Sequence, residues 1–252
     1  MKKRNVKIIK SLCLGVIVIL GAAVSAEAAS SEMVLSDIET NSENTSDISA
    51  YPEYEEIVQK YYDGILSHWT MQEYNENGLA YITYTIENLD DFGYYIVDVD
   101  EDGTEELFLG PVNLDGYKGM FYDLYTMKDG KLVQIMTSGE RDRYYLCEDN
   151  EIANEGSGSA MTSSWAYYNL VSGELVMKEH ILYDAYYDEE NPWFYSTSDE
   201  WGDYSSPVTE EAARSMIASR EYMDIPYIPY IPLLMLDANE LTLDNEAREI
   251  FD

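Results

Sequence analysis

The chain has 252 residues, with 49 acidic and 15 basic side chains and a formal net charge of −34. This charge disfavours nucleic acids and anionic membrane surfaces as partners, because phosphate binding needs clusters of Lys and Arg, and it favours divalent cations. Strong acidity alone can indicate disorder. However, a hydrophobic content of 46% and 24 Tyr predict that most of the chain buries a core.

Residues 1–28 have the order of a secretory signal peptide. A basic stretch ends at Lys10, an apolar run extends from Leu12 to Val24, and small residues follow at a cleavage site near Ala26 or Ala28. The apolar run is shorter than the roughly 20 residues of a membrane-spanning helix, and an uncleaved membrane anchor is the alternative. We therefore expect a secreted or cell-envelope-associated protein that has no membrane contact after signal cleavage.

The two cysteines predict neither a lipid anchor nor a disulfide. Cys13 lies inside the apolar run, which is a poor position for lipid attachment, and it is removed with the signal. Cys147 is then the only cysteine, so the fold must be stable without an internal disulfide. We interpret Cys147 as a small buried side chain on a strand.

A flexible acidic linker is predicted at residues 29–50, followed by a single α+β domain at 51–252. The linker is rich in Ser, Thr, Asn and acids and has no hydrophobic periodicity. The domain begins with a helix, because Pro52 suits the first helical turn and apolar side chains follow at helical spacing up to Trp69.

From residue 80 the hydrophobic period changes to two, which predicts strands. Asp129-Gly130 is a strong β-hairpin signal, and regularly spaced hairpins indicate an antiparallel meander of about 6–8 strands. The predicted strands are Ala80–Ile86, Tyr94–Val99, Glu106–Leu109, Met120–Met127, Leu132–Thr137, Arg143–Cys147, a segment near Ile152, Trp165–Leu170 and Leu175–Tyr183. Gly156–Ser159 is expected to be a loop or bulge.

A second helix is predicted after a long acidic loop at 186–206 that can hold one short strand. Ser206 or Thr209 is its expected N-cap. The repeat Pro226-Tyr-Ile-Pro229-Tyr-Ile-Pro232 forbids helix and favours an extended edge segment, and Asp244–Phe251 fits a short helix. The predicted fold class is therefore α+β, with an N-terminal helix, the meander and a C-terminal helix; a β-propeller fragment is the alternative.

The acidic loop Asp98–Glu106 is the clearest chemical motif. Calcium takes six to eight oxygen ligands, which a chain can supply from alternate residues when it curls around the ion. Gly103 permits the sharp turn that such a curl needs. The predicted ligands are Asp98, Asp100 and Asp102, the backbone carbonyl of Thr104, and Glu106 either directly or through water.

This loop departs from a full EF-hand. Leu109 stands where the bidentate Glu would be, and the flanking segments are strand-like rather than helical. We therefore expect weak calcium binding, in the roughly 10⁻⁴–10⁻³ M range of extracellular modules. The alternative is an acidic turn between two strands that needs no metal.

The loop resembles the strand–loop–strand calcium motif of exported bacterial proteins, of the kind seen in dockerin-like and integrin-type repeat loops. More broadly, the chain resembles a group of uncharacterised secreted or lipid-anchored proteins of Gram-positive bacteria. The matching segments are Asp98–Leu107, Phe121–Val133 and Arg141–Gly158. The resemblance implies export and a calcium site, and it implies no activity. The missing lipid-attachment cysteine suggests a freely released member.

Three functions are compatible with these features. The first is a non-enzymatic extracellular or cell-wall-associated protein with a structural calcium loop. The second is a module that binds a glycan or a cell-surface peptide or protein through exposed Tyr and Trp, with Trp165, Trp193 and Trp201 as candidates. The third is a hydrolase with an unmarked carboxylate pair. His68 and His180 are far apart in sequence and no Ser or Cys partner is marked, so we expect no enzymatic activity.

Overall fold

The computed structural model describes residues 48–112 and 116–230, all of which lie in one compact unit, Thr45–Asp252. The predicted signal peptide, residues 29–47 of the predicted linker and the predicted helix Asp244–Phe251 lie outside the described residues. The first described element is the short 3-10 helix η1 (Ile48–Ala50), and Ile48 is buried in the core. Residues 48–50 therefore belong to the folded unit rather than to the linker.

Two short α-helices begin the fold. Helix α3 (Pro52–Leu66) has Pro at its first turn and acidic residues near its positive end, and it buries one face. Helix α4 (Met71–Glu76) starts with a capping box, in which the Thr70 side chain accepts from the Glu73 N–H and the Glu73 carboxylate accepts from the Thr70 N–H.

The strands form two fully antiparallel sheets. The five-stranded sheet has the order β11-β1-β2-β4-β5, and the six-stranded sheet has the order β10-β9-β8-β7-β6-β3. The bounds are β1 (Phe92–Val97), β2 (Glu106–Pro111), β3 (Met120–Phe121), β4 (Asp123–Lys128), β5 (Lys131–Thr137), β6 (Asp142–Leu146), β7 (Ile152–Ser159), β8 (Thr162–Val171), β9 (Glu174–Asp184), β10 (Trp193–Ser196) and β11 (Ile228–Pro229). The Asp129-Gly130 hairpin, the short strand in the long loop and the predicted bulge between Ser157 and Ser159 are present.

The predicted single meander is wrong, because the chain passes between two sheets four times: from β2 to β3, from β3 to β4, from β5 to β6 and from β10 to β11. The change from β3 to β4 is at Tyr122, which splits the predicted strand Met120–Met127. At the change from β5 to β6, the Ser138 N–H donates to the Tyr122 carbonyl (2.6 Å) and the Ser138 hydroxyl donates to the Phe121 carbonyl (2.6 Å). These bonds hold the segment between β5 and β6 against the junction of β3 and β4.

The predicted strand Ala80–Ile86 is also wrong, because this segment contains the 3-10 helix η2 (Tyr81–Thr85). The Thr83 N–H donates to the Ala80 carbonyl, and the Ala80 N–H donates to the buried Tyr61 hydroxyl (2.8 Å). These local and side-chain bonds replace a strand ladder, and no described strand pairs with the segment. A second 3-10 helix, η3 (Leu89–Asp91), leads into β1.

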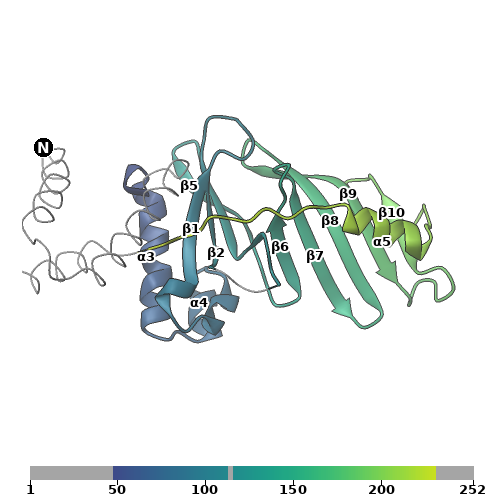
Figure 1. The fold of residues 1–252 in the computed structure, drawn as a ribbon, viewed down its shortest axis with the longest axis horizontal. Coiled ribbons are helices and arrows are strands. Elements are labelled where there is room, and N and C mark those ends of the chain that lie inside the picture. The colour runs from purple at the N-terminus through teal and green to yellow at the C-terminus, as the bar shows by residue number, and fades with distance from the viewer. Residues whose placement is uncertain (1–47, 113–115, 231–252) are drawn as a thin grey trace, which may run out of the picture. The chain divides into compact units, whose positions relative to one another are not determined.

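The core consists of two clusters, and each contains side chains of both sheets. The larger cluster packs α3 against the five-stranded sheet, along which α3 runs in Figure 1, and it continues over the six-stranded sheet to Ala213 of α5. The other includes Phe108, Phe121 and Ile152, so that alternate residues of β2 belong to different clusters. Strand β2 is therefore buried at all six positions. For the same reason both Tyr94 and Tyr95 are buried, whereas an ordinary surface strand would expose one of them.

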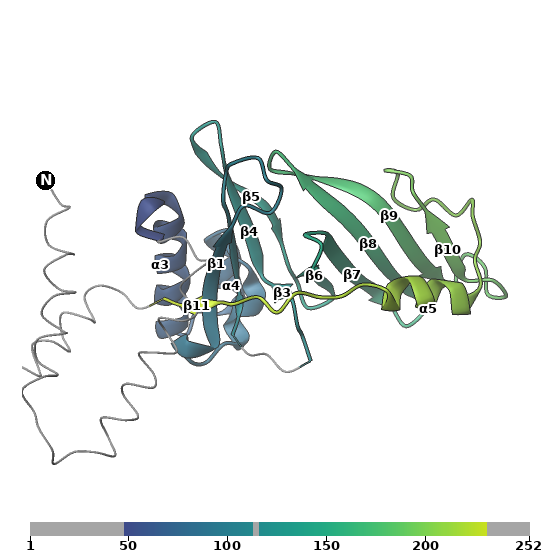
Figure 2. The same ribbon diagram turned by 45° about the horizontal axis from the view of Figure 1, so that its top comes forward.

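The predicted second helix is α5 (Glu210–Ala218), with the Thr209 hydroxyl accepting from the Ala212 N–H (3.2 Å). The prediction that a C-terminal helix follows the sheet is wrong for the described residues, because strand β11 follows α5. Figure 2 shows the chain returning from α5 as an extended segment to β11, which pairs with β1 at Gly93 and Tyr94. The proline-rich repeat thus contributes an edge strand, as predicted. None of the described helices is long and apolar enough to cross a membrane.

Candidate functional site

The acidic loop connects β1 and β2 and curls around Asp98. The Asp98 carboxylate accepts the N–H groups of Asp102 (3.1 Å) and Gly103 (2.9 Å). Gly103 adopts a φ of 91°, which glycine tolerates best. Asp98, Asp100 and Glu106 each place one carboxylate oxygen in a group whose members lie within 4.8 Å of one another. Three of the five predicted ligands are therefore brought together.

Glu106 is the unusual member of this group, because its side chain is completely buried. Its oxygens accept the Val99 N–H (3.0 Å) and the Thr126 hydroxyl (3.0 Å). Burial, together with the charges of Asp100 and Asp102, raises the pKa of Glu106 to about 7, although the two hydrogen bonds oppose the shift. No Lys or Arg of the described residues forms an ion pair with this carboxylate. A bound cation would supply the missing positive charge.

The Asp102 side chain does not join this group of carboxylates. The Asp102 carboxylate accepts the Thr104 N–H (2.8 Å) and closes a local turn. A contact that the sequence did not predict comes from the β8–β9 hairpin, where the Ser172 N–H donates to Asp100 (2.6 Å). The acidic loop of the five-stranded sheet is thereby fastened to a hairpin of the six-stranded sheet.

A second group with metal-ligand types consists of Cys147, Asp149 and Glu151. Glu151 is buried but already neutralised, because it pairs with Lys178 (2.7 Å) and Arg220 (2.9 Å). Burial raises the pKa of the Cys147 thiol to about 12. Because metals bind the thiolate, this group fits a cation less well than the acidic loop does.

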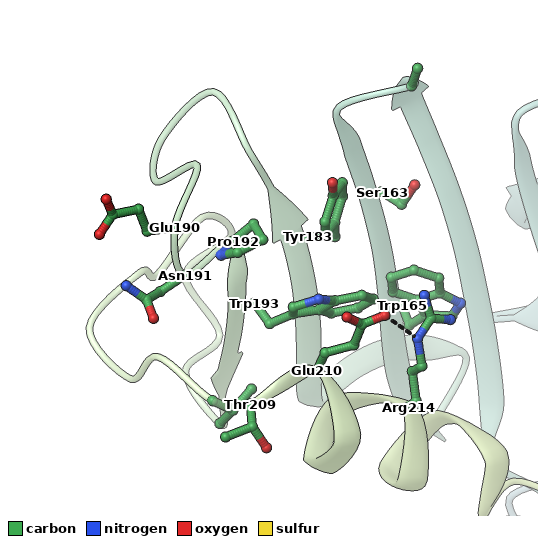
Figure 3. A pocket seen from close by; sticks show the side chains of 12 residues that line it. Ser163, Trp165, Tyr183, Glu190, Asn191, Pro192, Trp193, Thr209, Glu210 and Arg214 are labelled. Carbon is green, nitrogen blue, oxygen red and sulfur yellow. Dashed lines mark hydrogen bonds and ion pairs between the residues drawn. The ribbon is translucent and has the colours of Figure 1, made fainter.

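Aromatic side chains line a hollow on one face of the six-stranded sheet. Trp165 on β8 and Trp193 on β10 stack with ring centroids 5.7 Å apart, and Tyr183 on β9 lies 5.0 Å from Trp193. Arg214 of α5 lies over the Trp193 ring (5.4 Å) and pairs with Glu210 (Figure 3). The hollow has a volume of about 630 Å³.

A neighbouring hollow of about 410 Å³ continues this one across β6 and β7. The two share Ala160, Ser163 and Trp165. We call them together the aromatic groove. Its second half adds Arg141, Arg143 and Glu155, and Arg143, Glu155 and Trp165 lie directly opposite one another on adjacent strands.

Trp201, the third predicted tryptophan, lies elsewhere and stacks on His180 (5.5 Å). His180 is fully buried, burial lowers its pKa, and neither ring nitrogen has a hydrogen-bond partner among the described residues. Ser196 lies opposite His180 on β10, but its hydroxyl donates to Asp203 (2.7 Å). Sequence reasoning missed this Ser, His and Asp group because its members are not spaced as a motif. It lacks the nucleophile–base hydrogen bond of a catalytic triad.

Comparison with known proteins finds no match among protein-family models, among curated proteins or among solved structures. The resemblance to exported proteins of Gram-positive bacteria therefore rests on the sequence motifs themselves.

Proposed function

We propose that this protein is an exported, non-enzymatic extracellular or cell-wall-associated module whose fold is stabilised by calcium at the acidic loop. The observation that supports this proposal best is the buried Glu106 carboxylate, which converges with Asp98 and Asp100 and has no cationic partner among the described residues. Calcium prefers carboxylate and carbonyl oxygens, and water can complete its coordination.

Calcium at this position would have a structural effect beyond the loop. Asp100 contacts the β8–β9 hairpin through Ser172, and Glu106 contacts Thr126 on β4. An ion held by both carboxylates would stabilise the junction between the two sheets. Binding to the native state alone stabilises a protein by about 2.7 kcal/mol when the free ligand is at 100 times its Kd.

The test is calorimetric titration of calcium into the metal-stripped full chain. We expect one site in the parent and at least about tenfold weaker binding in Glu106→Gln, because a buried carboxylate ligand is removed at nearly constant shape. Glu101→Gln is the matched control, because Glu101 is exposed in the same loop and is not a predicted ligand. No binding at millimolar calcium, or equal binding by both variants, would contradict the proposal.

A second candidate function is glycan or peptide binding, and the stacking of Trp165 on Trp193 in the aromatic groove favours it. Aromatic rings offer a large, rigid apolar surface with a polar rim, which suits such ligands. Binding that is lost in Trp165→Ala and kept in Trp201→Ala would support this function, because Trp201 lies outside the groove. Absence of binding on a broad glycan array would argue against the glycan form.

A further inference from the structure

We infer that the aromatic groove binds a glycan that carries a carboxylate, that is, a short oligosaccharide containing an acidic sugar. This inference rests on the second candidate function above and names its ligand class. The first observation is the position of the arginines. Among the arginines of the described residues, Arg141, Arg143 and Arg214 line the groove. Positive side chains thus gather there although the chain has a net charge of −34.

Two of these arginines have no acidic partner. Arg141 is exposed at the start of β6, and it forms no ion pair within the described residues. Arg143 lies over the Tyr117 ring (5.3 Å), and it also forms no ion pair within the described residues. Arg220, by contrast, is held by Glu151 and Glu179. The guanidinium groups of Arg141 and Arg143 are thus available to a ligand carboxylate, which Arg recognises in a bidentate manner.

The groove floor suits a sugar ring. Trp165 and Tyr183 are half-buried at the groove, and the buried Trp193 packs against both, with an interplanar angle of 24° to Trp165. The apolar C–H face of a sugar packs on flat rings such as those of Trp165 and Tyr183. Hydroxyl and amide groups that can bond sugar hydroxyls surround them, contributed by Ser163, Asn191 and Thr209 in one half and by Ser157 and Ser159 in the other. Both hollows fall in the roughly 300–1,000 Å³ range of small-molecule sites.

The position of the groove favours a glycan over an extended peptide. A peptide gains much of its affinity by adding a strand to an open sheet edge. The groove instead lies over β6, β7, β8 and β9, which pair with a strand on both sides, and over the edge strand β10. The outer side of β10 is already occupied, because the Tyr195 N–H donates to the Ser206 carbonyl and the Val208 N–H donates to the Trp193 carbonyl. The carboxylates of Glu155, Glu190 and Glu210 also line it. They can accept sugar hydroxyls, and they oppose a ligand with dense negative charge.

The experiment titrates the full chain with oligogalacturonate, alginate oligomers and a hyaluronan tetrasaccharide, each paired with its carboxyl-reduced neutral form. We expect the acidic form of at least one pair to bind about tenfold more tightly, the gain of one charge-assisted hydrogen bond. Arg141→Gln should remove most of this preference. Lys131→Gln is the matched control, because Lys131 is also exposed, forms no ion pair within the described residues, and lies on β5 of the other sheet.

The outcomes separate the two ideas. Equal binding of acidic and neutral forms, with loss in Trp165→Ala, would overturn the acidic class and leave glycan binding intact. If neither the acidic nor the neutral oligosaccharides bind, and a broad glycan array shows no binding, both the acidic ligand class and glycan binding itself would be overturned. A preference that persists in Arg141→Gln would also overturn the inference, and because Arg141 is exposed, this variant is expected to fold.

Discussion

At the scale of single residues, the protein buries polar groups without opposite charges. Asp123 is buried and is held by the hydroxyls of Tyr61 and Tyr125, the Ala80 N–H (3.1 Å) and the Gln134 amide (3.1 Å). Burial raises its pKa. Glu106 shows the same pattern without a Tyr donor. Four donors surround the Asp123 carboxylate, whereas two donors bond Glu106 and two further carboxylates, of Asp98 and Asp100, lie close to it. Of these two buried acids, Glu106 is therefore the better metal ligand.

His180 gives a pH prediction at this scale. Burial lowers its pKa in the folded protein, so the unfolded chain binds more protons below pH about 6.5. Its contribution to stability is therefore complete above that pH and is lost as the pH falls below it, by at most about 1.4 kcal/mol per pH unit. The Asp203 charge opposes this effect. The measurement is the free energy of unfolding at pH 7.5 and 5.5.

We expect His180→Gln to lose less stability than the parent between these two pH values. The matched control is His68→Gln, because His68 is exposed just after α3. A parent and a His180 variant with the same pH dependence would show that His180 does not contribute. Comparing the change with pH, rather than absolute stability, cancels any packing cost of the substitution.

At the scale of elements, the β4–β5 and β8–β9 hairpins differ in how closely their turns pack against other segments. Asp129-Gly130 and Ser172-Gly173 both adopt positive φ angles, which is typical of two-residue hairpin turns. A Cβ at Gly130 would meet nothing within 4 Å, whereas one at Gly173 would lie 2.8 Å from the Thr126 side chain. Thr126 in turn donates to Glu106. The β8–β9 turn is therefore coupled to the acidic loop.

This difference predicts unequal costs for two similar substitutions. Gly130→Ala should destabilise the protein by about 1–2 kcal/mol, the cost of a left-handed backbone for a residue with a Cβ. Gly173→Ala should cost more, because it adds the clash with Thr126, and it should also weaken calcium binding. Urea denaturation and calcium titration measure the two effects. Equal costs and unchanged calcium binding would refute the coupling.

At the scale of the whole molecule, the charge of −34 is the dominant feature. Like charges repel across the compact state, and salt screens this repulsion over a Debye length of about 10 Å at 0.1 M. The described ion pairs involve mainly exposed side chains, and such pairs contribute little. The net effect of monovalent salt on stability should therefore be favourable.

We expect the melting temperature to rise between 10 mM and 0.3 M NaCl, by roughly 2–4 °C for each kcal/mol of relieved repulsion. The Glu106→Gln variant should respond to NaCl as the parent does, because the effect is not local. Calcium at the same ionic strength should add stability in the parent and not in the variant. A melting temperature that falls with NaCl would contradict this prediction.

The sequence by itself determined the features that depend on near neighbours. Pro52 starts a helix, Asp129-Gly130 forms a hairpin, and the Asp98–Glu106 segment curls on itself. For the cap of α5 the sequence offered Ser206 or Thr209, and the structure has Thr209. Each depends on the φ preferences and hydrogen bonds of a few consecutive residues, which the sequence specifies directly.

The tertiary structure decided what distant segments do to one another. The change of sheet at Tyr122 and the 3-10 helix at Tyr81–Thr85 follow from contacts with segments far away in the chain. The same holds for the contact of Ser172 with Asp100 and for the pairing of Trp165 with Trp193 in one groove. Such partners are selected by packing and strand pairing over the whole domain, and no local pattern encodes them.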